Sequence, residues 1–298
     1  MRILPFIFSL TLFPILMQAR ELVIPTPPDS LRVPQQRASF LARHYWDNMD
    51  WQDSAALSDT PFMEQNLSNF FAISGLASAE ARREGIDVLT KAASASAEGT
   101  RQVASLAYTY LYSILSPFFD EESYLLFADA LSTPEGGSDN LDEAELSRIA
   151  SRRAEIMKNR VGEEATDFSF IDRDGTQRSL SSTPGRRLLI FYDNDCEECD
   201  RLKETLANSG RLQSEIDGGA LSVVAVESYG AGPEEWESKA SMMPESWIVG
   251  RSVGGEIDNE EIYVLLTAPT IYLLDAQGRV EAKNLSPEKL EEALGFRL

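Results

Sequence analysis

The two cysteines of this 298-residue chain, Cys196 and Cys199, are separated by two glutamates. An apolar run typical of a buried strand precedes them, and a helical pattern follows. Cys196 is therefore expected at the N-terminus of a helix, where unpaired backbone N–H groups favour a thiolate. Cys199 would lie one turn further along and could attack a mixed disulfide formed by Cys196. The spacing and its setting predict thiol–disulfide exchange, in which Cys196 attacks and Cys199 resolves.

Acidic residues crowd this cysteine pair. The nearest in sequence are Asp193, Asp195, Glu197, Glu198 and Asp200. Like charge disfavours a thiolate and opposes the effect of the helix N-terminus. We therefore expect Cys196 to be a comparatively weak acid and the pair to have a comparatively low reduction potential, because a less stabilised dithiolate is a better reductant.

Alternating strands and helices are expected to position the cysteines. A hairpin is predicted over 167–180, about the turn at Asp174-Gly175. Further strands are predicted over 187–192, 221–226, 269–275 and 279–282. Helices are predicted over 199–216, 234–242 and 287–294. This order indicates an α/β domain with a mixed sheet flanked by helices, covering residues 161–298.

Residues 20–160 show apolar residues at helical spacing and predict an all-α domain. Its helices are expected over 37–46, from Pro61 to about Ile73, and over 81–97, 103–115, 117–131 and 141–160. A loop rich in Gly, Ser and Asp over 132–140 separates the last two. The predicted domain boundary falls near residue 160.

The first 19 residues predict a secretory signal peptide. Arg2 gives a positive start, residues 3–17 are largely apolar, and Ala19 is a small residue suited to cleavage. A membrane anchor is the weaker alternative, because the run is shorter than roughly 20 residues and contains Pro5 and Pro14. We expect an exported protein of the periplasm or cell envelope, without stable membrane insertion after cleavage.

Composition limits the partners. A hydrophobic content of 43% suits a globular core, whereas 27 basic against 48 acidic residues give a formal net charge of −21. Such a surface repels phosphate backbones and anionic lipids, so nucleic acid is not an expected partner. One histidine and two cysteines cannot supply a four-ligand Cys/His zinc site. Neither a metal nor an organic cofactor is expected.

The C-terminal half resembles the thioredoxin-like fold, and within it the exported TlpA-like group. The resemblance rests on Ala165–Phe168, the hairpin, the strand before the cysteines, and Ala268–Asp275. It implies that Pro269 is the cis-proline that shapes the docking site beside the dithiol. It also implies protein thiol or disulfide substrates and an upstream redox partner.

Two positions depart from the family pattern. Asp195 replaces the usual aromatic residue before the first cysteine, and Ile190 stands where thioredoxin carries a buried acid. Proton transfer would then need another group. Glu227, at the end of a predicted core strand, is our candidate, and an exposed strand-end carboxylate is the simpler interpretation.

Three alternatives remain open. Peroxiredoxins share the fold, but Asp193 stands where they typically need Thr or Ser. A purely structural disulfide would explain the two cysteines but not their place at a strand–helix junction. A non-catalytic envelope protein that binds partners or supports structure could also retain the fold.

The helical region resembles an uncharacterised helical domain found ahead of thioredoxin-like domains in exported bacterial proteins. Ala42–Asp47, Trp51 and Phe62–Asn66 carry this resemblance. Its aromatic residues are expected in a core, and His44 is expected to pack or to cap a helix. A role for this domain in presenting partners to the dithiol is a hypothesis. The sequence as a whole predicts an exported thiol–disulfide oxidoreductase with a helical N-terminal domain.

Overall fold

The computed structural model describes residues 20–252, Ile257 and residues 262–298. The predicted signal peptide lies outside these residues. The chain divides into two compact units. The helical unit comprises the described residues up to Tyr110 together with Asp129–Leu141, and the sheet unit comprises Leu111–Ala128 together with Asp142–Leu298. These packing units differ in their residue ranges from the predicted domains of 20–160 and 161–298. The domain boundary near residue 160 stays a prediction.

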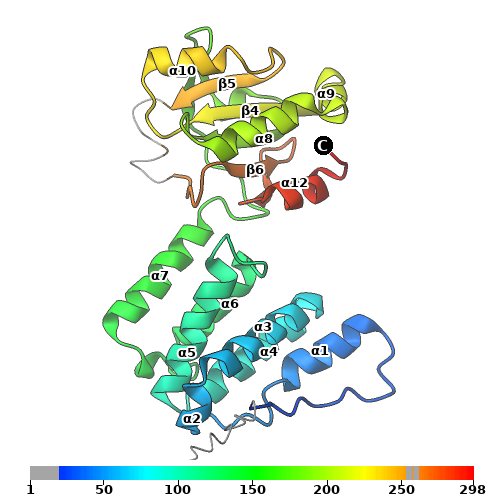
Figure 1. Ribbon diagram of the computed structural model, residues 1–298, viewed down its shortest axis with the longest axis vertical. Coiled ribbons are helices and arrows are strands. Elements are labelled where there is room, and N and C mark those ends of the chain that lie inside the picture. The colour runs from blue at the N-terminus through cyan, green and yellow to red at the C-terminus, as the bar shows by residue number, and fades with distance from the viewer. Residues whose placement is uncertain (1–19, 253–256, 258–261) are drawn as a thin grey trace, which may run out of the picture. The chain divides into compact units, whose positions relative to one another are not determined.

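Helices build the first part of the chain (Figure 1). They are α1 (Pro34–His44), α2 (Ser54–Leu57), α3 (Thr60–Leu76), α4 (Ala79–Ala93), α5 (Ala97–Ala107), a π-helical turn (Tyr108–Tyr112), α6 (Glu121–Leu131), a 3₁₀ turn (Ser138–Asn140) and α7 (Glu143–Met157). Side-chain caps begin several of them. Ser78 caps α4, for example, and Asp142 forms a capping box with Glu145 at the start of α7.

The core of the helical unit is aromatic. Tyr45, Trp46, Trp51 and Phe70 are each at most 5% exposed, and their rings contact one another. The Tyr45 hydroxyl donates a hydrogen bond to the buried amide of Asn66, at 3.1 Å. The aromatic residues that the sequence singled out therefore serve packing.

A seven-stranded mixed sheet forms the centre of the sheet unit, in the order β2-β1-β5-β4-β3-β6-β7. The strands are β1 (Ser169–Asp172), β2 (Gln177–Ser179), β3 (Arg186–Tyr192), β4 (Leu221–Glu227), β5 (Ile248–Ser252), β6 (Thr270–Leu274) and β7 (Val280–Lys283). Strand β3 is parallel to β4 and antiparallel to β6. This confirms the predicted mixed α/β sheet.

Both faces of the central strands are covered. Leu188, Ile190 and Tyr192 of β3 enter one apolar cluster, whereas Leu189 and Phe191 enter the other. Helices α8 (Glu197–Asn208), α9 (Gly210–Asp217), α10 (Pro233–Ala240) and α12 (Pro287–Leu294) contribute to the first cluster (Figure 1). Burial on both sides explains why β3 is an unbroken apolar run and not an alternating one.

Two sequence predictions for the C-terminal half were wrong in detail. The single helix expected over 199–216 is two helices, because Ser209 leaves the helical conformation and its hydroxyl accepts the N–H of Leu212 to begin α9. Strand β5 was missed because Gly250 weakens its strand pattern. A side chain at Gly250 would collide with the Phe170 ring, so close packing against β1 requires glycine there.

A 3₁₀ turn, Leu180–Ser182, follows β2.

No helix in the described part of the chain has the length and apolar character of a membrane span.

Candidate active site

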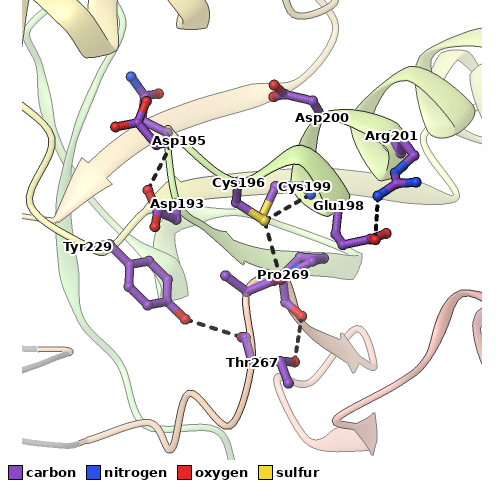
Figure 2. Close-up of a disulfide and its surroundings, with 12 residues drawn as sticks. Asp193, Asp195, Cys196, Glu198, Cys199, Asp200, Arg201, Tyr229, Thr267 and Pro269 are labelled. Carbon is purple, nitrogen blue, oxygen red and sulfur yellow. Dashed lines mark hydrogen bonds and ion pairs between the residues drawn. A yellow bond between two sulfur atoms is a disulfide. The ribbon is translucent and has the colours of Figure 1, made fainter. Parts of the chain in front are cut away.

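The cysteine pair lies where β3 leads into α8. A disulfide joins Cys196 and Cys199, whose Cα atoms are 5.2 Å apart (Figure 2). Cys196 is the N-cap of α8, and its Sγ accepts the backbone N–H of Cys199 at 3.1 Å. Cys199 is fully buried, whereas Cys196 is half-buried. Only Cys196 is therefore open to a partner, which is the asymmetry that an attacking and a resolving cysteine need.

The turn before β6 faces the disulfide (Figure 2). The Ala268–Pro269 peptide bond is cis, and the Ala268 carbonyl oxygen lies 3.3 Å from Cys196 Sγ. The neighbouring Thr267 carbonyl accepts hydrogen bonds from the Tyr229 hydroxyl, at 3.2 Å, and from the Thr270 hydroxyl. Pro269 thus lies beside the cysteine pair, where the resemblance implied it.

Basic side chains accompany the carboxylates at the start of α8. Arg201 pairs with Glu198 and lies 3.8 Å from Glu197. Lys203 contacts Asp200 at 2.7 Å, and Lys239 lies 3.8 Å from Asp195. The local charge is therefore more balanced than the acidic run alone indicates.

Sequence reasoning missed these cations. Arg201 and Lys203 could have been found from their spacing of three or four residues to Glu197, Glu198 and Asp200 on one helix. Lys239 reaches the site only through tertiary structure, because it comes from α10 and also donates to the Asn194 carbonyl.

Glu227 ends β4 and is 2% exposed, so the simpler interpretation of an exposed strand-end carboxylate is wrong. Its carboxylate accepts the backbone N–H groups of Tyr229, at 2.9 Å, and Ala231, at 3.2 Å. Burial raises the pKa of Glu227, and the negative charge of Asp193 adds to this effect, although the backbone N–H groups act in the opposite direction. These hydrogen bonds hold the loop that carries Tyr229, whose hydroxyl reaches the Thr267 carbonyl beside Pro269.

A cavity of about 600 Å³ opens beside the disulfide. Glu198, Ala268 and Pro269 contribute to its lining, so it begins at the atoms that surround Cys196. In the described residues no group of three or more His, Cys, Asp or Glu side chains is placed to hold a metal ion.

The sheet, the disulfide at the start of α8 and the adjacent proline turn define a thioredoxin-like protein. A thioredoxin-like protein from Bacteroides caccae, solved by crystallography, is similar over 93% of this chain and 99% of its own, with 26% identity and a TM-score of 0.85. The family model of the domain of unknown function DUF5106 matches residues 11–159, half of the chain. The chain therefore belongs to this family.

Two further solved structures match the C-terminal half. A conserved protein of unknown function from Bacteroides fragilis shares 34% identity over 45% of this chain and 98% of its own, with a TM-score of 0.43. The thioredoxin domain of a thiol-disulfide oxidoreductase from Bacteroides vulgatus shares 22% identity over 45% of this chain and 95% of its own, with a TM-score of 0.36. The sequence has no significant match among curated proteins.

These comparisons confirm two predictions from the sequence. The thioredoxin-like fold is present, and a helical domain without assigned chemistry precedes it.

Proposed function

We propose that this protein is an exported thiol–disulfide oxidoreductase that reduces or exchanges disulfides in proteins of the periplasm or cell envelope. The observation that carries the proposal is the Cys196–Cys199 disulfide, with the half-buried Cys196 beside the Ala268 carbonyl and the buried Cys199 behind it. The apolar segment over residues 3–17 supports export. The TlpA-like group of the thioredoxin-like proteins is the subtype we infer.

The reductive cycle requires the dithiol form. The Cys196 thiolate attacks one sulfur of the substrate disulfide, which forms a mixed disulfide and releases the other substrate sulfur as a thiolate. Cys199, as a thiolate, then attacks Cys196 Sγ, which forms the Cys196–Cys199 disulfide and releases the second substrate thiolate. Two electrons pass to the substrate, and an upstream dithiol protein returns two electrons to the pair.

The other site residues have supporting roles in this proposal. Pro269 shapes the surface on which the substrate backbone lies beside Cys196. Glu227 is the candidate for proton transfer, because burial raises its pKa and so favours the protonated carboxyl. Its hydrogen bonds to the loop after β4 also support a positioning role for Glu227.

A trapping experiment tests the proposal. The Cys199→Ser protein, reduced and incubated with a disulfide-bonded test protein, should accumulate a mixed disulfide through Cys196. Cys196→Ser is the matched control and should trap nothing, and its exchange rate should fall to the uncatalysed background. A reduced wild-type protein whose Cys196 does not react with a thiol reagent would instead identify a structural disulfide.

A further inference from the structure

The cavity beside the disulfide is lined mainly by apolar side chains. Leu202 comes from α8, Ile271 from β6, and Leu298 ends the chain. At about 600 Å³ the cavity is within the size range of ligand sites in proteins, roughly 300–1,000 Å³. It is therefore large enough to accept an apolar side chain and part of the backbone that bears it.

Ile114 and Leu115 also line this cavity, although they precede the predicted thioredoxin-like domain. Leu115 is 89% exposed, compared with 70% for Leu76, the exposed leucine that ends α3. An apolar side chain this exposed at the rim of a cavity is available to cover a bound segment.

Contacts on the C-terminal side anchor the segment that carries Leu115. Lys289 of α12 donates to the Phe119 carbonyl at 3.3 Å, and its ammonium lies 5.7 Å from the centre of the Phe119 ring. Glu121 lies 3.3 Å from Lys283 of β7, and the two side chains are 11% and 3% exposed. Asn284 also donates to Glu121, at 3.1 Å. These contacts tie Phe119 and Glu121, which follow Leu115 closely in the chain, to β7 and α12 within the sheet unit.

Charge at the cavity favours a basic partner. Glu198 and Glu291 line it, and Glu197, whose side chain is 85% exposed, lies one residue from Glu198. Arg201, the one cation among the described lining residues, is paired with Glu198. An anionic small disulfide would be repelled here, whereas a segment bearing Lys or Arg would be attracted.

We propose that Ile114 and Leu115 form a specificity wall of the active site, which selects polypeptide disulfides with an apolar side chain next to the cysteine and a basic residue nearby. This inference rests on the proposed thiol–disulfide exchange and names its substrate class. The wall acts on substrate binding and leaves the sulfur chemistry unchanged.

Two substrate peptides of equal length, each containing a disulfide, test the specificity wall in the full-length protein. One carries Leu beside the cysteine and a flanking Lys, and the other carries Ser and Glu at these positions. Wild type should turn over the Leu/Lys peptide with the higher kcat/KM, and added salt should reduce this preference. Leu115→Ser should lower kcat/KM for that peptide about tenfold, because one apolar contact commonly discriminates by 10–200-fold.

The controls separate the wall from the chemistry. Leu76→Ser, which removes an exposed leucine of α3, should leave both peptides unaffected. Leu76→Ser should also reduce the small neutral hydroxyethyl disulfide at the wild-type rate, and Leu115→Ser should lose less activity toward this disulfide than toward the Leu/Lys peptide. If the wild type turns over both peptides without a preference, the specificity wall is overturned and the proposed function is not. The same holds if the wild type is a dimer that Leu115→Ser dissociates, because Leu115 would then contact a second copy of the chain. No turnover of any disulfide overturns the proposed function and the wall with it.

Discussion

The helical unit and the sheet unit use their unusual residues in opposite ways. In the helical unit the aromatic residues close a core, and its one histidine, His44, ends α1 with its ring on Phe40 and a 2.9 Å contact to Asp47. In the sheet unit a half-buried sulfur meets an open cavity and several paired charges. The buried aromatic residues of the helical unit contribute packing, whereas the sulfur of Cys196 stays accessible beside a cavity and charged side chains, as thiol–disulfide exchange requires.

The range of the family match differs from the range of the helical packing unit. The family match ends at residue 159, yet Leu111–Ala128 and the segment from Asp142 onward pack with the sheet unit. Lys283, for instance, donates to the Ile156 carbonyl at 2.9 Å. Part of the family domain therefore packs within the unit that carries the candidate active site.

The largest effect that tests this contrast is expected in the aromatic core. Phe70→Ala should lower the free energy of unfolding of the helical unit by about 3–5 kcal/mol, because Phe70 is fully buried among Tyr45, Trp46 and Phe71. Under conditions where the chain stays folded, disulfide exchange should change less than about twofold. Denaturant melts and an exchange assay on one sample measure both quantities. A parallel loss of exchange would show that the helical core also supports the site.

A smaller effect concerns Glu227 and pH. Burial raises the pKa of Glu227 in the folded protein above its usual value of 4.5, so the stability that its protonated form contributes is present below that value. This stability is lost as pH rises through the folded pKa. Relative to Glu227→Gln, the wild type should therefore lose stability as pH rises from about 4 to about 8.

Urea denaturation of both proteins across this pH range measures the trend. Glu237→Gln, at an exposed position of α10, is the control for loss of one negative charge. If the wild type instead becomes more stable relative to Glu227→Gln as pH rises, the pKa of Glu227 is lowered by folding and the assigned direction is wrong.

The smallest effect is expected at the charged start of α8. Arg201→Gln removes a cation that offsets Glu197 and Glu198, so the Cys196 thiolate should be less stable and the reduction potential lower. Exposed pairs contribute about 0.2–1 kcal/mol, which corresponds to about 5–20 mV for a two-electron couple. Redox titration against Arg211→Gln, whose side chain is equally 59% exposed on α9, measures the shift. Equal reduction potentials for the two variants would show that Arg201 does not affect the potential of the cysteine pair.

Local sequence determined the elements that carry the sulfur chemistry. The Cys-x-x-Cys spacing at a strand–helix junction predicted the helix start at Cys196, and the apolar run of β3 predicted a central strand. These features depend on neighbours in the chain, such as the N–H of Cys199, which donates to Cys196 Sγ. The fold class followed from their order.

Tertiary structure decided what surrounds the sulfur. Ala268 is 72 residues from Cys196 in the chain, and Lys239 is 45 residues from Asn194. Leu115 lines the same cavity as Leu202 of α8 and Ile271 of β6, which are distant from it in the chain. A residue pattern shows the local conformation and the face that is buried, but it does not show which distant segments meet. The packing of the sheet, α12 and the segment before α6 determines which distant segments meet at the cavity.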